Sequence, residues 1–190
     1  MKRIAEIGFW LGVLCACIPL LMYLFGNTRQ WQLRHEWQTA ENSPASASSS
    51  SNTAPASGDD GLLRLRIPRL HVDSLVVGDT TNAALAQGPG HFPGTAMPGQ
   101  VGNCAIAAHR NIWGCWFANL NELEPGDRVI LETLKRHFVY LVTDTETVPP
   151  DDTSVLKAKG HLREVSLITC TVPPSRRIVV HGVLDHVSVT

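Results

Sequence analysis

The sequence lacks the surplus of positive charge that nucleic-acid binding requires. Its 16 Lys and Arg residues are offset by 17 Asp and Glu residues, which gives a net charge of −1 over 190 residues. A protein that holds the phosphate backbone of DNA or RNA needs a basic surface. We therefore expect no nucleic-acid partner and consider a peptide the better candidate.

Patterns typical of metal sites are also missing. The chain has 8 histidines and 5 cysteines, yet it contains no H-E-x-x-H, C-x-x-C or H-x-H arrangement, and these are spacings at which proteins hold zinc. The acidic pair Asp151-Asp152 stands alone and is better interpreted as a loop than as a calcium site. We predict no metal and no cofactor, and the sequence leaves calcium dependence open.

Charged residues are absent from residues 7–25, which follow Lys2 and Arg3. This apolar stretch is near the length that crosses about 30 Å of hydrocarbon. No small-residue cleavage pattern follows it, which favours an uncleaved anchor over a signal peptide. The basic residues before it favour a cytoplasmic N-terminus. We predict that residues 1–26 form a single-pass anchor in the inner or plasma membrane, embedded through residues 7–25, with the rest of the chain on the extracytoplasmic (periplasmic) side.

Residues 27–60 are predicted to form a juxtamembrane segment and a linker. The part up to residue 42 is expected to prolong the helix, with Trp31 and Trp37 at the membrane interface. The remainder is dominated by Ser, Ala, Thr and Pro and has no hydrophobic pattern, so it cannot bury enough surface to order itself. We expect a flexible tether with a span of about 25 Å, and a domain at 61–190 that folds without residues 1–60.

From Leu62 onward the apolar runs have strand length and are separated by Pro and Gly. These runs predict strands at 63–67, 128–134, 137–143, 165–168 and 178–184. Short helices are predicted at 81–87 and 112–120. Many short strands within about 130 residues indicate a single all-β barrel or sandwich.

The five cysteines separate by location. Cys15 and Cys17 lie in the apolar span, where small residues suit helix packing, so three cysteines remain in the exported part. In an oxidising compartment Cys104 and Cys115 could pair and leave Cys170 free, but two buried thiols fit the spacing as well. The disulfide therefore stays open. Cys170 itself could also be an inert, buried strand cysteine.

The stretch from Leu167 to Val180 contains residue types that acyl transfer needs. Cys170 ends one apolar run and Arg177 opens the next, and the two prolines between them predict a short return that brings these residues close. A thiolate is the reactive form of cysteine, and a nearby cation favours it. The arginine could also hold a developing oxyanion. His109, which ends the apolar run 105–108, could carry a proton near neutral pH.

These segments together resemble the sortases, a family of membrane-anchored cysteine transpeptidases. The resemblance rests on Leu-Ile-Thr-Cys at 167–170, on Arg177 at the head of a strand, and on Ala-His-Arg-Asn at 108–111. Three further segments, residues 65–70, 88–94 and 123–127, also resemble sortase segments and occur along the chain in the order that the family shows. The short interval from Cys170 to Arg177 resembles the sortase type of Gram-negative, particularly proteobacterial, genomes. The resemblance implies an all-β fold, a closed eight-stranded barrel with one or two short helices, preceded by a single transmembrane helix.

The resemblance also implies a reaction. Cys170 would attack a backbone carbonyl within a C-terminal sorting motif of the Leu-Pro-x-Thr-Gly kind on an exported protein, and His109 would protonate the departing amine. Arg177 would steady the peptide and the oxyanion, and an amine-bearing acceptor or water would then resolve the thioester. His91 is the second candidate for the histidine, and a register change of one residue would exchange Arg177 for Arg176.

Two other classes use similar residues. Another membrane-anchored cysteine peptidase or an L,D-transpeptidase would also need Cys and His. The latter expects Ser/Thr-x-Gly-Cys, which residues 167–170 lack, and papain-like enzymes place cysteine before histidine. A non-catalytic, membrane-anchored β module is the third interpretation, in which Cys170 is buried and resists thiol reagents. The exact sorting motif, the acceptor and the oligomeric state stay open.

Overall fold

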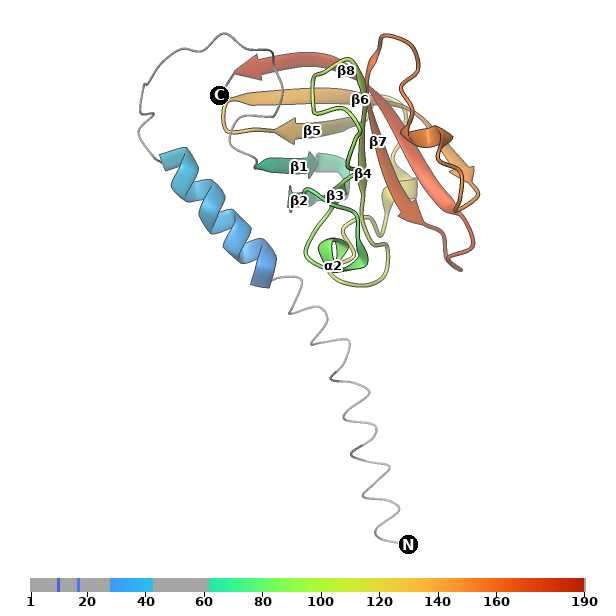
Figure 1. Ribbon diagram of the computed structural model, residues 1–190, viewed down its shortest axis with the longest axis horizontal. Coiled ribbons are helices and arrows are strands. Elements are labelled where there is room, and N and C mark those ends of the chain that lie inside the picture. Colours follow the sequence, from blue (N-terminus) through green and yellow to red (C-terminus); the bar gives the residue numbers. More distant parts are fainter. Residues whose placement is uncertain (1–9, 11–16, 18–27, 43–61, 190) are drawn as a thin grey trace, which may run out of the picture.

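The computed structural model describes residues 10, 17, 28–42 and 62–189 (Figure 1). The described part contains eight strands, which are β1 (Leu63–Ile67), β2 (Val72–Val76), β3 (Gly90–His91), β4 (Gly102–Ala107), β5 (Arg128–Glu132), β6 (Arg136–Val148), β7 (Arg163–Cys170) and β8 (Arg177–Val189). One short α-helix and three 3-10 turns connect them: α2 (Asn82–Leu85), η2 (Pro68–Leu70), η3 (Leu120–Glu122) and η4 (Ser154–Leu156). The strands form a single sheet in the order β2-β1-β5-β6-β8-β7-β4-β3.

The two edge strands of this sheet approach each other, so that the barrel is nearly closed. The backbone amide of Val77 donates to the carbonyl of Pro89, and the amide of His91 donates to the carbonyl of Val77, each at 2.8 Å. These bonds form an isolated parallel bridge between Val77 and Gly90, next to β2 and β3. The predicted eight-stranded, all-β barrel is confirmed in this nearly closed form.

The secondary-structure predictions were right for the strands and for one of the two helices. The predicted strand at 63–67 coincides with β1, and the helix predicted at 81–87 is present as α2. The helix predicted at 112–120 is wrong, because that segment consists of turns up to the start of η3. Trp113, Gly114 and Cys115 have φ values of 52°, 93° and 52°, a left-handed backbone that no right-handed helix accommodates.

Alternate residues of each strand face opposite sides of the sheet, and both sides are apolar where β4, β7 and β8 run together. The barrel interior contains Ile106, Leu131 and Leu167, all with 0% exposure. The opposite face has a second cluster, here called the outer cluster, made of Ala105, Ala107, Val148, Val155, Ile168 and Val179, with Leu85, Phe92 and Leu156 packed against it. Because Ile168 belongs to the outer cluster, strand alternation places Ser166 and Cys170 on the same face.

The helix at 28–42 packs against the edge strand β2. Leu33 and Trp37 are buried together with Leu75. The side chain of Gln30, only 6% exposed, accepts a hydrogen bond from the amide of Leu75 at 2.9 Å and donates one to its carbonyl at 3.0 Å. Its amide nitrogen also donates to the carbonyl of Gln87 at 2.8 Å. Gln30 thus satisfies the unpaired backbone of an edge strand as a neighbouring strand would.

This packing corrects one expectation. Residues 28–42 do form a helix, but Trp37 lies against the barrel rather than at a membrane interface, whereas Trp31 is 63% exposed. The barrel also contacts residues before 61, and a chain without this helix would expose Leu75 and the edge of β2. Whether residues 61–190 fold on their own stays a prediction. Truncating a buried aromatic side chain typically costs about 3–5 kcal/mol, so this contact is a substantial part of the fold.

The predicted membrane anchor and tether lie almost wholly outside the described residues. Of the span 7–25, only Trp10 and Cys17 are described, and both are helical and exposed. Within the described ranges, no helix combines the length and the apolar character that crossing a bilayer demands. The anchor, and the tether at 43–60, therefore stay predictions.

Candidate active site

Cys170 and Arg177 occupy opposing positions on two adjacent strands. Cys170 is the last residue of β7, Arg177 is the first residue of β8, and the antiparallel register pairs them directly. The connection between them is closed by bonds from the Thr171 amide to the Arg176 carbonyl and from the Arg176 amide to the Thr171 hydroxyl, both at 3.0 Å. Directly opposed residues project from the same face with Cβ atoms about 4.5–5.5 Å apart. The predicted return of the chain is confirmed.

The register also separates the two neighbouring arginines. Arg176 extends to β6, where its Nη2 donates to the carbonyl of Thr147 at 2.9 Å. Among the described residues, Arg177 makes a longer contact of 3.4 Å from Nη1 to the carbonyl of Arg176. Only Arg177 lies opposite Cys170, so the structure favours it over Arg176. Its role in catalysis stays a prediction.

His109 lies beside the end of β7 that carries Cys170. Strand β4 pairs in parallel with β7, and the contact continues beyond the end of β4. The Ala108 amide donates to the carbonyl of Ile168 at 3.1 Å, and the Ala108 carbonyl accepts from the Thr169 hydroxyl at 2.9 Å. His109 is the next residue, so the ends of three neighbouring strands, β4, β7 and β8, bring the three predicted site residues to one region of the molecule.

The imidazole of His109 is suited to proton transfer. Burial lowers the pKa of His109 below its ordinary value, which favours the neutral ring near neutral pH. Its Nε2 atom is buried and has no hydrogen-bond partner among the described residues. A neutral imidazole with an unengaged nitrogen can accept a proton from a thiol or return one to a leaving amine.

Arg110 supports the segment that carries this histidine, which the sequence suggested only by adjacency. Its Nη2 donates to the side-chain oxygen of Asn121 in η3 at 2.7 Å. This bond holds the chain directly after His109 against η3.

His91, the second candidate for the histidine, is already engaged. Its Nε2 lies 3.0 Å from the carbonyl of Ala96 and 3.1 Å from the hydroxyl of Thr95. The ring therefore holds the loop that follows β3. The structure favours His109 as the proton carrier.

The cysteines differ in their environment. The four described cysteines are free thiols, so Cys104 and Cys115 are not joined by a disulfide. Cys104 lies in the barrel interior with 1% exposure, and burial raises its pKa to about 12, which keeps it an unreactive thiol. Cys115 is exposed on the loop at 110–119. Cys170 is partly exposed and is the described cysteine that has an arginine opposite it.

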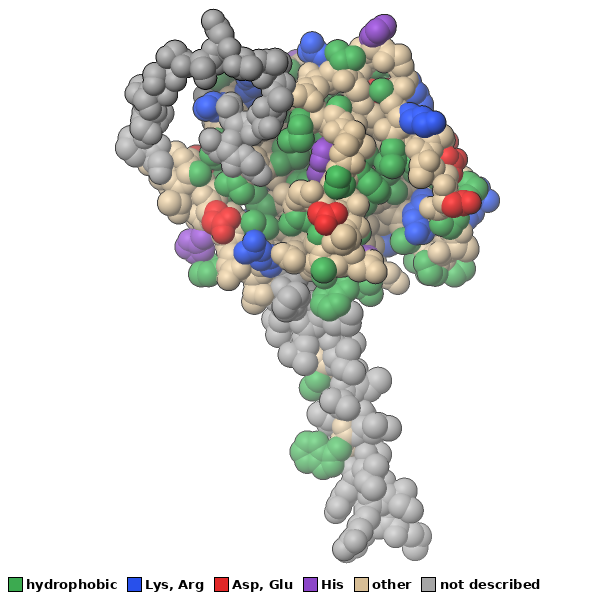
Figure 2. Space-filling view, viewed as in Figure 1, with side chains coloured by type: hydrophobic (Ala, Val, Ile, Leu, Met, Phe, Trp, Pro, Cys, Tyr) green, Lys and Arg blue, Asp and Glu red, His purple; other side chains and the backbone are tan. Residues whose placement is uncertain are grey.

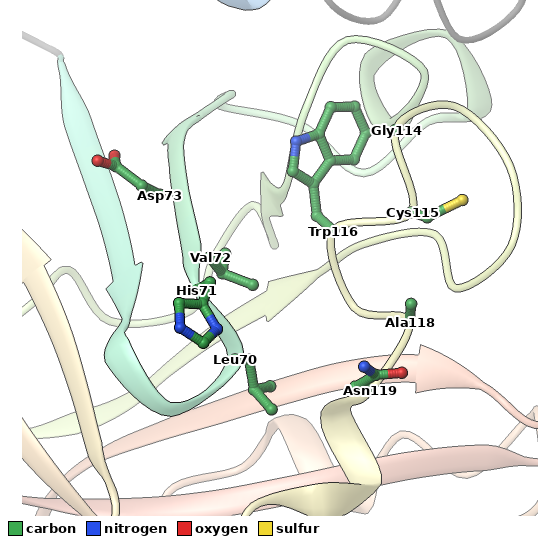
Figure 3. Close-up of a pocket in the computed structure, with 9 residues that line it drawn as sticks. All are labelled: Leu70, His71, Val72, Asp73, Gly114, Cys115, Trp116, Ala118 and Asn119. Carbon is green, nitrogen blue, oxygen red and sulfur yellow. The ribbon is translucent and has the colours of Figure 1, made fainter.

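A cavity of about 230 Å³ lies elsewhere, between the turn that joins β1 to β2 and the loop at 114–119 (Figure 3). It is lined by Leu70, His71, Val72, Asp73, Gly114, Cys115, Trp116, Ala118 and Asn119. None of the three predicted site residues lines it, and the sulfur of Cys115 points away from His71 and Trp116 in Figure 3. Asp73 is paired with Arg64 at 2.6 Å. In the described part of the chain, no group of three or more His, Cys, Asp or Glu side chains forms a potential metal site.

Comparisons with known proteins agree with this architecture. The family model of the sortase domain matches residues 65–185. Sortase SrtE1 of Streptomyces coelicolor is 33% identical over 193 residues, which cover 90% of this chain and 52% of that protein. This chain thus spans about half the length of that relative. Sortase D of Bacillus subtilis is 27% identical over 153 residues, 76% of each chain.

Solved structures are similar as well. The Sortase D5 transpeptidase of Clostridium perfringens has a TM-score of 0.70 at 27% identity, and the match covers 84% of this chain and 99% of that one. Sortase E1 from Streptomyces coelicolor, solved with a tripeptide in its active site, has a TM-score of 0.63 at 30% identity over 68% of this chain and 90% of that one. The proteobacterial subtype is not tested by these matches and stays a prediction. Because the family model covers most of the barrel, this chain belongs to the sortase family, whose members are cysteine transpeptidases.

Proposed function

We propose that this protein is a cysteine transpeptidase that cleaves a Leu-Pro-x-Thr-Gly-like sorting motif and transfers the acyl part to an amine. The observation that carries this proposal is the register that sets Cys170 opposite Arg177, with His109 beside the end of the same strand. A thiol, a cation and a proton carrier are the groups that acyl transfer through a thioester requires.

The reaction follows from these three groups. His109 takes the proton of the Cys170 thiol as the sulfur forms a bond to the carbonyl carbon of the motif, and Arg177 donates hydrogen bonds to the oxygen that gains negative charge. The carbon–nitrogen bond then breaks, and His109 delivers a proton to the departing amine. In the second half, an incoming amine attacks the thioester and loses a proton to His109, while Cys170 leaves as the thiolate. Water in place of the amine gives hydrolysis.

An extended peptide is the substrate class that this region favours. Cys170 and Arg177 lie at the partly exposed ends of the paired strands β7 and β8, and a peptide bound along strands adopts an extended form. On the face seen in Figure 2, acidic and basic side chains are interspersed among apolar ones. Such a surface fits a peptide of mixed character better than a polyanion.

A transfer assay tests the activity. We expect the protein to cleave a Leu-Pro-x-Thr-Gly peptide between Thr and Gly, and to join the acyl fragment to an added amine such as triglycine, as measured by mass spectrometry. Without the amine, the same fragment should appear as the free acid. Cleavage that yields only the acid at every amine concentration would indicate a peptidase instead, and the absence of cleavage would contradict the proposed motif.

We also propose that residues 7–25 anchor the protein in the inner or plasma membrane, with the barrel on the extracytoplasmic side. The uncharged run behind Lys2 and Arg3 supports this arrangement. Full-length protein should stay in the membrane fraction after carbonate washing, as measured by immunoblotting. Recovery of a mature protein that begins just after residue 26 would instead show a cleaved signal peptide.

A further inference from the structure

A connected set of polar side chains crosses the face of the sheet that carries Cys170. The hydroxyl of Ser166 lies 3.0 Å from Nδ1 of His181, and Nε2 of that histidine lies 2.8 Å from a carboxylate oxygen of Glu146. Ser166 also donates to the side-chain oxygen of Asn103 at 3.0 Å. These four residues, here called the polar chain, come from the adjacent strands β4, β7, β8 and β6.

Three of the four side chains are deeply buried. Asn103, Ser166 and His181 are 4%, 0% and 8% exposed, whereas the side chain of Glu146 is 44% exposed. Polar groups buried in an apolar face are unfavourable unless each has a partner. The outer cluster already supplies apolar packing here, so what the polar chain adds is directional bonding.

Two members of the polar chain approach the same backbone carbonyl, which lies outside the sheet. The side-chain nitrogen of Asn103 donates to the carbonyl of Val155 at 2.8 Å, and the Ser166 hydroxyl lies 3.5 Å from the same oxygen. Val155 belongs to η4, in the middle of the connection from β6 to β7 at residues 149–162, here called the β6–β7 segment. A further bond, from the Lys159 amide to Glu164 at 2.8 Å, holds its far end.

The β6–β7 segment stands next to the predicted nucleophile. Ser166 with His181, Ile168 with Val179, and Cys170 with Arg177 are successive register pairs on one face. Such pairs are separated by about 7 Å along the strands. Val155 and Leu156 pack in the outer cluster together with Ile168 and Val179, the pair adjacent to Cys170. A peptide bound at Cys170 along this face would therefore meet the β6–β7 segment.

We propose that Asn103, Ser166 and His181 are positioning residues that hold the β6–β7 segment as a preformed wall of the peptide site. This inference rests on the proposed function for its substrate, since the wall acts on whatever peptide reaches Cys170. The polar chain touches neither the reacting sulfur nor His109. It sets how tightly the peptide binds, while the chemistry at Cys170 is left to the three site residues.

The test compares two serine substitutions that remove the same atom from equally buried sites. Ser166→Ala breaks the polar chain. Ser74→Ala is the control: Ser74 lies on the edge strand β2, is 0% exposed, and donates a hydrogen bond to the side chain of Gln30 at 2.9 Å. We expect Ser166→Ala to raise KM for the Leu-Pro-x-Thr-Gly peptide about fivefold to tenfold, the scale of one or two lost hydrogen bonds. We expect kcat, and the rate of Cys170 alkylation by iodoacetamide, to change less than about twofold. Ser74→Ala should change none of the three.

Hydrogen exchange provides a readout that needs no activity. In Ser166→Ala, amides of the β6–β7 segment should exchange at least about tenfold faster than in the wild type, and in Ser74→Ala they should not. Glu146→Ala removes only the exposed end of the polar chain, so it preserves folding and should give a smaller change of the same sign. Unchanged exchange in both variants of the polar chain, or an equal rise in KM in Ser74→Ala, would overturn the inference. If the wild type cleaves no peptide, the proposed function fails, and the exchange rates still decide whether the polar chain holds the segment.

Discussion

Replacing Cys170 with alanine should abolish cleavage of a Leu-Pro-x-Thr-Gly peptide and the formation of any thioacyl adduct. Neither of the other cysteines in residues 62–189 is placed to substitute for it, because Cys104 is a buried thiol with a pKa of about 12, and Cys115 lies on the loop at 110–119, outside strands β7 and β8. Stability should change little, since a small side chain at the partly exposed end of β7 leaves less void than a core truncation. Mass spectrometry of the protein and a urea titration measure the two effects.

The matched control is Cys115→Ala, which removes an exposed thiol outside the proposed site and should retain full activity. Two outcomes would contradict the assignment of the nucleophile. Cleavage by Cys170→Ala at the rate of the wild type would eliminate Cys170 directly. Unfolding of that variant would favour the interpretation of Cys170 as a structural strand cysteine.

The second large effect concerns the residues beside the nucleophile. His109→Ala and Arg177→Ala should each lower kcat by about a hundredfold or more, the scale of losing a proton carrier or an oxyanion donor. Arg177→Lys should recover little activity, because an ammonium lacks the planar fork of donors that a guanidinium provides. Steady-state kinetics with the same peptide measures all three variants.

Neighbouring residues of the same type are the controls. Arg176→Ala should cost less than about threefold, because Arg176 bonds to Thr147 on β6 rather than facing Cys170. His91→Ala should likewise retain most of the turnover if its ring only holds the loop at 95–96. A hundredfold loss in Arg176→Ala or in His91→Ala would exchange the assigned residue for its neighbour.

The all-β class and the Cys170–Arg177 pairing were predictable because both depend on short-range pattern, whereas the closed barrel was expected only from the resemblance to the sortases. Strand-length apolar runs separated by Pro and Gly determine the all-β class. The two prolines between Cys170 and Arg177 leave room only for a tight return, which fixes an antiparallel pair. In contrast, the apolar residues of 112–120 resembled a helix, and nothing local revealed the left-handed backbone at Trp113 and Cys115.

Contacts between distant segments were not predictable. The pattern of Gln30, Leu33 and Trp37 marks one face of a helix, but its partner on β2 lies about 45 residues away along the chain, and tryptophans near an apolar span suggested a membrane interface instead. The polar chain was missed for the same reason. Its histidine meets a glutamate 35 residues away, and only the strand register brings them together.

The docked helix changes what the Ser- and Pro-rich stretch does. Helix 28–42 and strand β1 are already fixed to each other through β2, so the residues between them join two parts of one rigid unit. Their length does not determine how far the catalytic domain reaches from the bilayer. With the proposed anchor at residues 7–25, only residues 26 and 27 would separate the membrane span from the helix that is docked on the barrel. The enzyme would then meet its substrates by lateral diffusion at a nearly constant height above the membrane, rather than by moving on a long flexible linker.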